Sequence, residues 1–256
     1  MFLLVRSSLR AAALALLLGG ALLAFAGSGV GGARADRLTV FAASSLTGAF
    51  EAHDPGARYS FGSSGTLETQ IRLGAPADLF ASASPRNTQR LFAEGLVDKP
   101  VVFASNRLAL IVPRANPAGL RTVADLRSRP VRLVIAGEAV PAGAYAVAVL
   151  GRLGLEDVLA KVVSREPDVK AVTAKVALGQ ADAGLVYATD VRAVSDKVLV
   201  IPLPARAQPD VRYEIAVVGR SPRKAAARAW IRGLLSPRGQ AALRRAGFLP
   251  VLKEPS

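Results

Sequence analysis

Residues 38–46 read LTVFAASSL, a run of small and apolar residues followed by two serines and a leucine. A continuous apolar run of this length is typical of a strand that is buried on both faces of a sheet. The serines that follow can cap a helix, because a Ser side chain accepts a hydrogen bond from a free backbone N–H of the first turn. The stretch therefore predicts a buried strand that leads directly into a helix.

The same succession of strand and helix recurs along the chain. Further strands are predicted at residues 58–61, 78–83, 107–112, 131–136, 182–187, 198–203 and 213–218. Helices are predicted at 66–73, 142–153 and 169–179, and after the Ser-Pro pairs at 84–85, 221–222 and 236–237. This alternation indicates an α/β fold with mainly parallel sheets, and the length fits two sheets better than one.

The first 35 residues have the pattern of a secretory signal peptide. Arg6 and Arg10 accompany an apolar run at 11–26, and Ala33-Arg34-Ala35 matches a cleavage site. The apolar run is shorter than the roughly 20 residues that a membrane span requires. We therefore expect cleavage after Ala35 and a periplasmic or extracellular protein. A lipid anchor is not expected, because the chain contains no cysteine.

The chain is strongly basic, with a formal net charge of +14. Such a surplus raises the local concentration of anions. The cations are scattered rather than gathered in runs, and aromatic residues make up only 5% of the chain, which argues against stacking on nucleic-acid bases. We expect a small anionic ligand and no nucleic-acid partner. A basic protein that interacts with the cell envelope remains an alternative.

Few residues are suited to catalysis or to metal binding. His53 is the only histidine and lies in a His-Asp-Pro-Gly turn, so it is predicted to be a surface residue. A Ser-His-Asp triad would have to use it, and no Gly-x-Ser-x-Gly elbow accompanies it. Clusters of His, Cys or acidic residues that could bind a metal ion are not evident. The sequence therefore favours a protein that is not an enzyme and has no cofactor; an enzyme that uses a loop serine stays as the alternative.

Three junctions between a predicted strand and a predicted helix share the same character. They read ASSL at 43–46, FGSSGT at 61–66 and VPAG at 140–143. Ligands in α/β folds bind where strands end and helices begin. A helix N-terminus offers unpaired backbone N–H groups and the positive end of a dipole, and serine adds a neutral donor. Several such ends could together hold a dianion without any Arg or Lys.

Six segments resemble the periplasmic molybdate-binding proteins of molybdate ABC transporters. They lie at 39–47, 61–67, 74–83, 140–143, 168–170 and 184–190, in the order found in that family, and together they cover nearly the whole mature chain. The resemblance implies a two-lobed, type II-like binding-protein fold with its ligand in the cleft between the lobes. It further implies a first lobe at 36–108 and 213–256 and a second lobe at 109–212, with crossings near 108–112 and 203–213.

The resemblance also implies how the oxyanion is bound. Ser45 and Ser64 would donate through hydroxyl and backbone N–H groups, Ala142 and Val169 through backbone N–H groups, and Tyr187 through its hydroxyl. Molybdenum would be held as the molybdate anion, with no direct metal-ion ligand from the protein. Tungstate, its analogue, would bind through the same residues. The expected partner is an ABC permease and the expected state is a monomer; sulfate and phosphate remain alternative ligands. One departure is the helix after Thr47, which is about two turns shorter than is usual in the family.

Overall fold

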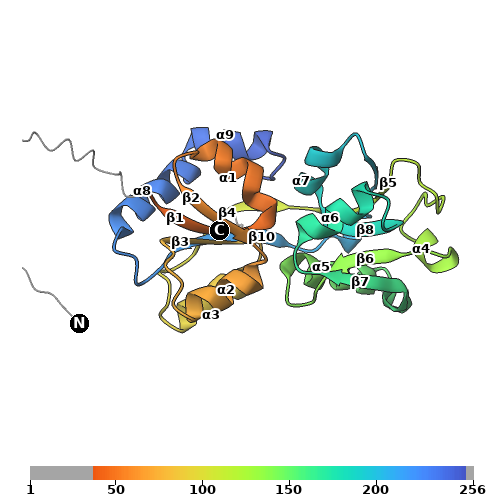
Figure 1. Cartoon of the computed structure of the whole chain (residues 1–256), viewed down its shortest axis with the longest axis horizontal. Coiled ribbons are helices and arrows are strands. Elements are labelled where there is room, and N and C mark those ends of the chain that lie inside the picture. The colour runs from red at the N-terminus through yellow and green to blue at the C-terminus, as the bar shows by residue number, and fades with distance from the viewer. Residues whose placement is uncertain (1–36, 252–256) are drawn as a thin grey trace, which may run out of the picture. The chain divides into compact units, whose positions relative to one another are not determined.

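The computed structural model describes residues 37–251, so the predicted signal peptide lies outside the described residues. The described chain contains two five-stranded sheets flanked by helices (Figure 1). The predicted α/β class is therefore confirmed. The first sheet has the strand order β2-β1-β3-β10-β4. Its strands are β1 (Thr39–Ala43), β2 (Arg58–Gly62), β3 (Leu79–Ser82), β4 (Val101–Asn106) and β10 (Val211–Val217).

The second sheet is formed by the part of the sequence between β4 and β10. Its strand order is β7-β6-β8-β5-β9. The strands are β5 (Leu108–Pro113), β6 (Leu133–Ala136), β7 (Val162–Glu166), β8 (Ala183–Tyr187) and β9 (Val198–Ile201). The sequence did not predict β4 and β7. Both lie at the edge of a sheet, and β7 alternates between half-buried and exposed residues, so neither reads as a long buried run.

Each sheet is mainly parallel, as predicted, but contains one antiparallel strand that the sequence did not predict. In the first sheet β1 runs parallel to β2 and β3, whereas β10 runs antiparallel to β3 and β4. In the second sheet β6 runs parallel to β7 and β8, whereas β5 runs antiparallel to β8 and β9. The antiparallel strands β5 and β10 begin where the chain has just crossed from one sheet to the other. The pattern of buried residues reports burial and not strand direction, so it could not reveal this.

Helices cover both faces of the first sheet. In Figure 1, α2 (Ser64–Arg72) and α3 (Pro85–Ala93) lie on one face, and α1 (Thr47–His53), α8 (Lys224–Leu235) and α9 (Pro237–Arg245) lie on the other. The side chains of β1 alternate accordingly. Phe41 packs in a cluster with Leu67 of α2 and Leu91 of α3, whereas Val40 belongs to the main core with Phe50 of α1 and Trp230 of α8.

Helices α5 (Pro141–Arg152) and α6 (Val169–Ala177) pack against the second sheet, and the short helices α4 (Asp125–Ser128) and α7 (Ala188–Val191) lie beside it. The 3-10 turns are η1 (Ser44–Leu46), η2 (Glu156–Lys161), η3 (Arg192–Val194) and η4 (Ala205–Ala207). Of the helix starts predicted from Ser-Pro pairs, those at 84–85 and 236–237 are confirmed. The third helix begins only at Lys224, two residues after Pro222.

The short helix α1 is covered by a tryptophan of α8. The Phe50 side chain is fully buried, and the ring of Trp230 meets it edge-on at 5.0 Å between centroids. Trp230 also packs edge-on against His53 at 4.8 Å and donates a hydrogen bond from Nε1 to Asp54 at 3.1 Å. His53 is therefore half-buried rather than a simple surface residue, and burial lowers its pKa.

The chain crosses between the sheets twice. It passes from β4 to β5 at Arg107 and returns between Ile201 and Val211. The two crossings are joined by Gln208, whose side chain accepts a hydrogen bond from Leu108 N and donates one to Leu108 O, each at 2.9 Å. This pair of bonds links the two crossings directly. The exact division of the chain into lobes stays a prediction.

Candidate functional site

Ser45 lies where β1 ends. The strand passes directly into the turn η1, and Ser45 is half-buried in that turn. Its Oγ lies 2.9 Å from the hydroxyl oxygen of Tyr213, which reaches it from β10. The junction predicted from two serines is therefore formed, although neither serine side chain caps the helix that follows.

Ser64 occupies the second junction, between β2 and α2. The N-cap of α2 is the neighbouring Ser63, whose Oγ accepts a hydrogen bond from Thr66 N at 3.1 Å. Ser64 is 1% exposed, and its Oγ accepts a hydrogen bond from the backbone N–H of Ala83 at 3.0 Å. Because that bond uses only a lone pair of the oxygen, the hydroxyl proton of Ser64 is left to donate elsewhere.

The third junction, between β6 and α5, is made possible by a glycine. The helix begins at Pro141, which has no N–H, and no side chain caps it. The N–H groups of Gly143 and Ala144 donate to the carbonyl oxygen of Val140, so the N–H of Ala142 is the one in the first turn that is open to another acceptor. A Cβ on Gly143 would lie 2.2 Å from the carbonyl oxygen of Gly137 and 2.3 Å from that of Ala136. Only glycine therefore allows the first turn, which contains Ala142, to pack this closely against the end of the strand.

Val169 is the first residue of α6. The helix is capped by Asp168, whose side chain accepts a hydrogen bond from Ala171 N at 3.0 Å. This cap satisfies an N–H farther along the first turn, not that of Val169. Val169 is 2% exposed, so its backbone lies at a helix start inside the protein.

Tyr187 ends β8 and carries a hydroxyl group with no hydrogen-bond partner among the described residues. The side chain is 1% exposed, and its ring packs against that of Tyr213 at 5.8 Å between centroids. Burial raises the pKa of Tyr187 well above its ordinary value, so the group is a neutral donor at physiological pH. A buried polar group without a partner is costly, and a ligand could satisfy it.

All five predicted site residues line one small cavity between the two sheets. The cavity has a volume of about 10 Å³, close to what one water molecule requires. Its lining is made of small, apolar and hydroxyl-bearing residues and contains no charged side chain. The lining residues are Ala43, Ser44, Ser45, Gly62, Ser63, Ser64, Ala83, Val140, Pro141, Ala142, Val169 and Tyr187.

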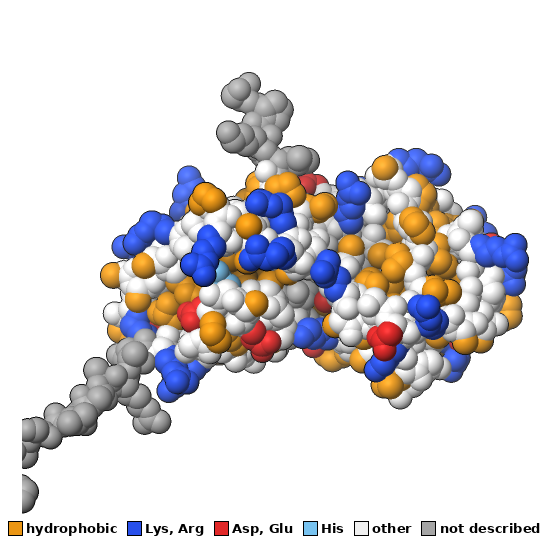
Figure 2. Space-filling model, turned by 90° about the horizontal axis from the view of Figure 1, so that it is seen from above, with side chains coloured by type: hydrophobic (Ala, Val, Ile, Leu, Met, Phe, Trp, Pro, Cys, Tyr) orange, Lys and Arg blue, Asp and Glu red, His pale blue; other side chains and the backbone are white. Residues whose placement is uncertain are grey.

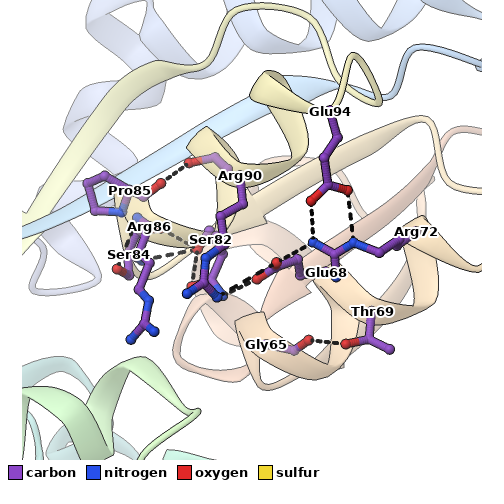
Figure 3. Close-up of polar contacts among 12 residues, drawn as sticks. Gly65, Glu68, Thr69, Arg72, Ser82, Ser84, Pro85, Arg86, Arg90 and Glu94 are labelled. Carbon is purple, nitrogen blue, oxygen red and sulfur yellow. Dashed lines mark hydrogen bonds and ion pairs between the residues drawn. The ribbon is translucent and has the colours of Figure 1, made fainter.

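A hollow of about 880 Å³ borders one side of the cavity and shares Ser63, Val140 and Pro141 with it. On its wall, Arg72 donates hydrogen bonds to the buried Glu68 at 2.7 Å and to Glu94 at 2.8 Å (Figure 3). The carboxylate of Glu68 is thus paired with a cation, so this wall does not present a bare negative charge to an approaching anion.

A second hollow, of about 550 Å³, shares Ser45 with the cavity and is lined by Lys170, Arg192 and Asp190. Asp190 is 7% exposed, and its Oδ2 has no hydrogen-bond partner among the described residues. Burial raises the pKa of Asp190 to about 7, while nearby Lys170 opposes the shift. The carboxyl group is therefore largely protonated below neutral pH.

Charged side chains lie outside the cavity. Figure 2 shows Lys and Arg side chains spread over the visible face rather than gathered in one patch. Among residues 37–251 no group of three or more His, Cys, Asp or Glu side chains could hold a metal ion. None of the helices in this range is long and apolar enough to cross a membrane.

The sequence missed two residues behind the site, Asn106 of β4 and Tyr213 of β10. Tyr213 was predicted only as part of a strand, and Asn106 lay in a strand that was not predicted. Both are buried, and the Asn106 side chain donates a hydrogen bond to the Tyr213 hydroxyl at 3.3 Å. Tyr213 shares the alternation of Val211 and Ile215, which is a signal for burial, whereas Asn106 lies between Ser105 and Arg107 and carries no such signal. No local pattern connects either residue to Ser45.

Comparison with known proteins gives relatives over most of the chain. A molybdate-binding protein ModA of Mycobacterium tuberculosis is 34% identical over 221 residues, covering 82% of this chain and 84% of that protein. The protein of the same name from Escherichia coli is 32% identical over 256 residues, covering 91% and 96%. The structure of the periplasmic molybdate-binding protein of Azotobacter vinelandii matches with a TM-score of 0.74 at 24% identity, covering 85% of this chain and 100% of that one.

This structural match confirms the predicted two-lobed binding-protein fold, with one sheet in each lobe. The family described as bacterial extracellular solute-binding protein matches residues 38–249, nearly all of the described chain. The chain therefore belongs to the bacterial extracellular solute-binding protein family.

Proposed function

We propose that this protein captures molybdate, or its analogue tungstate, outside the cytoplasmic membrane and delivers it to an ABC permease. The observation that carries the proposal is the uncharged cavity, where two serines, two helix starts and an unpartnered tyrosine hydroxyl meet. The names of the relatives from Mycobacterium tuberculosis and Escherichia coli support the choice of molybdate.

Neutral donors suit a dianion that must be bound and released. Serine hydroxyls, a tyrosine hydroxyl and helix N-termini stabilise negative charge by directed dipoles. An Arg or Lys in the cavity would attract the anion more strongly and discriminate less by shape. No covalent bond is made or broken in such a process, so we propose a binding protein that is not an enzyme and needs no cofactor. We further propose that it acts as a monomer.

The cavity must widen to admit an oxyanion. A tetrahedral oxyanion contains five heavy atoms, whereas the present volume of about 10 Å³ suits one water molecule. The size of the widened cavity would separate molybdate from sulfate, because both are tetrahedral dianions with equivalent acceptor oxygens. Movement at the crossings beside Gln208 is a direct way for the two lobes to part.

Calorimetric titration of the protein without residues 1–35 tests the proposal. Molybdate, tungstate, sulfate and phosphate are titrated separately at physiological salt. We expect tight one-to-one binding of molybdate and tungstate and weak binding of sulfate and phosphate. Tight binding of sulfate or phosphate instead would assign a different anion to the site. Binding of none of the four, with polyanions bound in a strongly salt-dependent way, would support an envelope-interaction protein.

A further inference from the structure

The Tyr213 hydroxyl contacts Ser45, and the Asn106 side chain contacts Tyr213. Neither Asn106 nor Tyr213 lines the cavity. Asn106 is the last residue of β4, and Tyr213 lies in the neighbouring strand β10. The register between these strands shifts next to Tyr213, where Phe103 is an extra residue in β4. Such a bulge redirects side chains locally. Tyr213 and Glu214 are both buried, as expected for adjacent residues in a sheet that is covered on both faces.

The orientation of the Asn106 amide is fixed by a backbone group. Its Oδ1 accepts a hydrogen bond from Arg107 N at 2.9 Å, and a backbone N–H can only donate, so the oxygen must lie on that side. The Nδ2 group then points the other way. It donates to Thr189 Oγ1 at 2.9 Å and to Tyr213 Oη at 3.3 Å.

The direction of the next hydrogen bond follows from burial. Tyr213 is 0% exposed, so its hydroxyl proton needs an acceptor within the protein. Its oxygen already accepts from Asn106, and among the described residues Ser45 Oγ, at 2.9 Å, is the acceptor within reach. If Ser45 donated to Tyr213 instead, the buried proton of Tyr213 would have no acceptor, which costs free energy.

We propose that Asn106 and Tyr213 are positioning residues that direct the hydroxyl proton of Ser45 into the cavity. The bonds run from Asn106 to Tyr213 and from Tyr213 to Ser45, and the proton of Ser45 is left to donate to the oxyanion. This inference rests on the proposed function. A chain of hydrogen bonds in one direction polarises each member, so it also makes Ser45 a stronger donor.

The same amide group reaches the second lobe. Thr189 belongs to α7, two residues after Tyr187, so the second hydrogen of Asn106 Nδ2 is held by the lobe that carries the unpartnered hydroxyl. Asn106 thus contacts both lobes at the crossing where one sheet gives way to the other. The same amide group therefore helps to hold the two lobes in place and to direct the hydroxyl proton of Ser45.

A double-mutant cycle tests the proposal. Tyr213→Phe removes the hydroxyl and keeps the ring, Ser45→Ala removes the final donor, and the third protein carries both changes. We expect each single variant to bind molybdate about tenfold more weakly by calorimetry, as for the loss of one hydrogen bond to a charged group. The double variant should bind no more weakly than Ser45→Ala, because Tyr213 acts only through Ser45.

Tyr59→Phe is the matched control. The Tyr59 hydroxyl donates to Phe50 O and Asp54 O, each at 2.8 Å, and none of these residues lines the cavity. Its loss should lower thermal stability and leave affinity unchanged. Asn106→Ala is a second probe that leaves the Tyr213 hydroxyl in place. Its effect on affinity should be smaller in the Ser45→Ala background, where only its contact with Thr189 is still lost. Circular dichroism checks that each variant is folded.

The outcomes separate this inference from the proposed function. Losses of affinity that add in the double variant, or full affinity in Tyr213→Phe, would overturn the positioning role while leaving the proposed function intact. A wild-type protein that binds none of the oxyanions would overturn the proposed function and the positioning role together.

Discussion

The two lobes line the cavity with different kinds of groups. The first lobe supplies the hydroxyls of Ser45 and Ser64, and each of these lies within hydrogen-bond distance of another protein group. The second lobe supplies the backbone at two helix starts and the hydroxyl of Tyr187, which has no partner among the described residues. The first-lobe hydroxyls are thus hydrogen-bonded without the anion, whereas the Tyr187 hydroxyl of the second lobe gains a partner only when the anion binds. Substitutions in the two lobes should therefore affect stability and affinity in different proportions.

The largest expected effect is that of Ser64→Ala in the first lobe. The variant loses a donor to the oxyanion and leaves the buried N–H of Ala83 without its acceptor. We expect molybdate affinity to fall about a hundredfold and the free energy of unfolding to fall by about 2 kcal/mol. Calorimetry and urea denaturation measure the two. Ser236→Ala, which removes the N-cap of α9, should lower stability alone; an equal loss of affinity there would contradict the assignment.

The contact between the lobes is tested by Gly65→Ala. A Cβ on Gly65 of the first lobe would lie 2.7 Å from the carbonyl oxygen of Ala139 in the second. The added methyl group should hold the lobes slightly apart without disturbing either. Overpacking of this kind costs about 2 kcal/mol, so we expect affinity to fall about thirtyfold.

The matched control for this change is Gly48→Ala, because a Cβ there meets no atom within 4 Å. Both substitutions replace a helical glycine of the first lobe by alanine. Gly48→Ala should leave affinity unchanged and stabilise the protein by about 0.5 kcal/mol. Equal affinities of the two variants would show that the contact at Ala139 does not limit binding.

Asp190→Asn tests the second lobe through pH. The carboxyl group of Asp190 has its pKa raised to about 7 by burial, above the ordinary value near 4 in the unfolded chain. It therefore stabilises the fold when protonated, and this contribution is lost as pH rises from about 4 to about 7. Relative to wild type, the variant should gain on the order of 2 kcal/mol in free energy of unfolding between pH 5 and pH 8.

Denaturation by urea at both pH values measures that change. Asp196→Asn replaces an exposed aspartate and should show the same difference from wild type at either pH. A difference between Asp190→Asn and wild type that does not vary with pH would mean that Asp190 ionises as readily in the folded protein as in the unfolded chain.

The smallest expected effect is that of Tyr187→Phe. The variant loses a donor to the anion, so affinity should fall about tenfold. Because the hydroxyl has no partner without the anion, the unfolding free energy of the anion-free protein should stay the same or rise. Thermal melting with and without molybdate distinguishes this from Ser64→Ala, which loses stability in both conditions. A large loss of stability without anion would show that the hydroxyl is already hydrogen-bonded.

Short-range sequence patterns predicted the helices and strands that carry the site. Features that depend on contacts between distant parts of the chain could not be predicted in this way. Serine pairs and Pro141 follow short-range patterns, so the junctions after β1, β2 and β6 could be located from sequence, although the serines after β1 do not form the predicted cap. Val169 and Tyr187 came only from the family resemblance, because an apolar residue at a helix start and a tyrosine at a strand end usually serve packing. The structure brings all five predicted residues to one cavity.

What the sequence missed depends on residues far apart in the chain. Asn106 and Tyr213 are 107 positions apart, and their hydrogen bond exists only because β10 returns beside β4. The mixed direction of the sheets has the same origin, since a strand's own residues do not record the direction of its neighbours. The half-burial of His53 likewise depends on Trp230, which belongs to a helix near the other end of the chain.

The helix starts at Ala142 and Val169 have a consequence for how this site can evolve. A backbone N–H is present whatever the side chain, so mutations at these two positions can reshape the cavity without deleting a donor. Selection to keep the donors acts instead on neighbours that fix the helix starts, such as Gly143 and Asp168. Under the proposed function, descendants of this protein can exchange one oxyanion for another by drift in cavity shape, while inheriting the same set of backbone contacts.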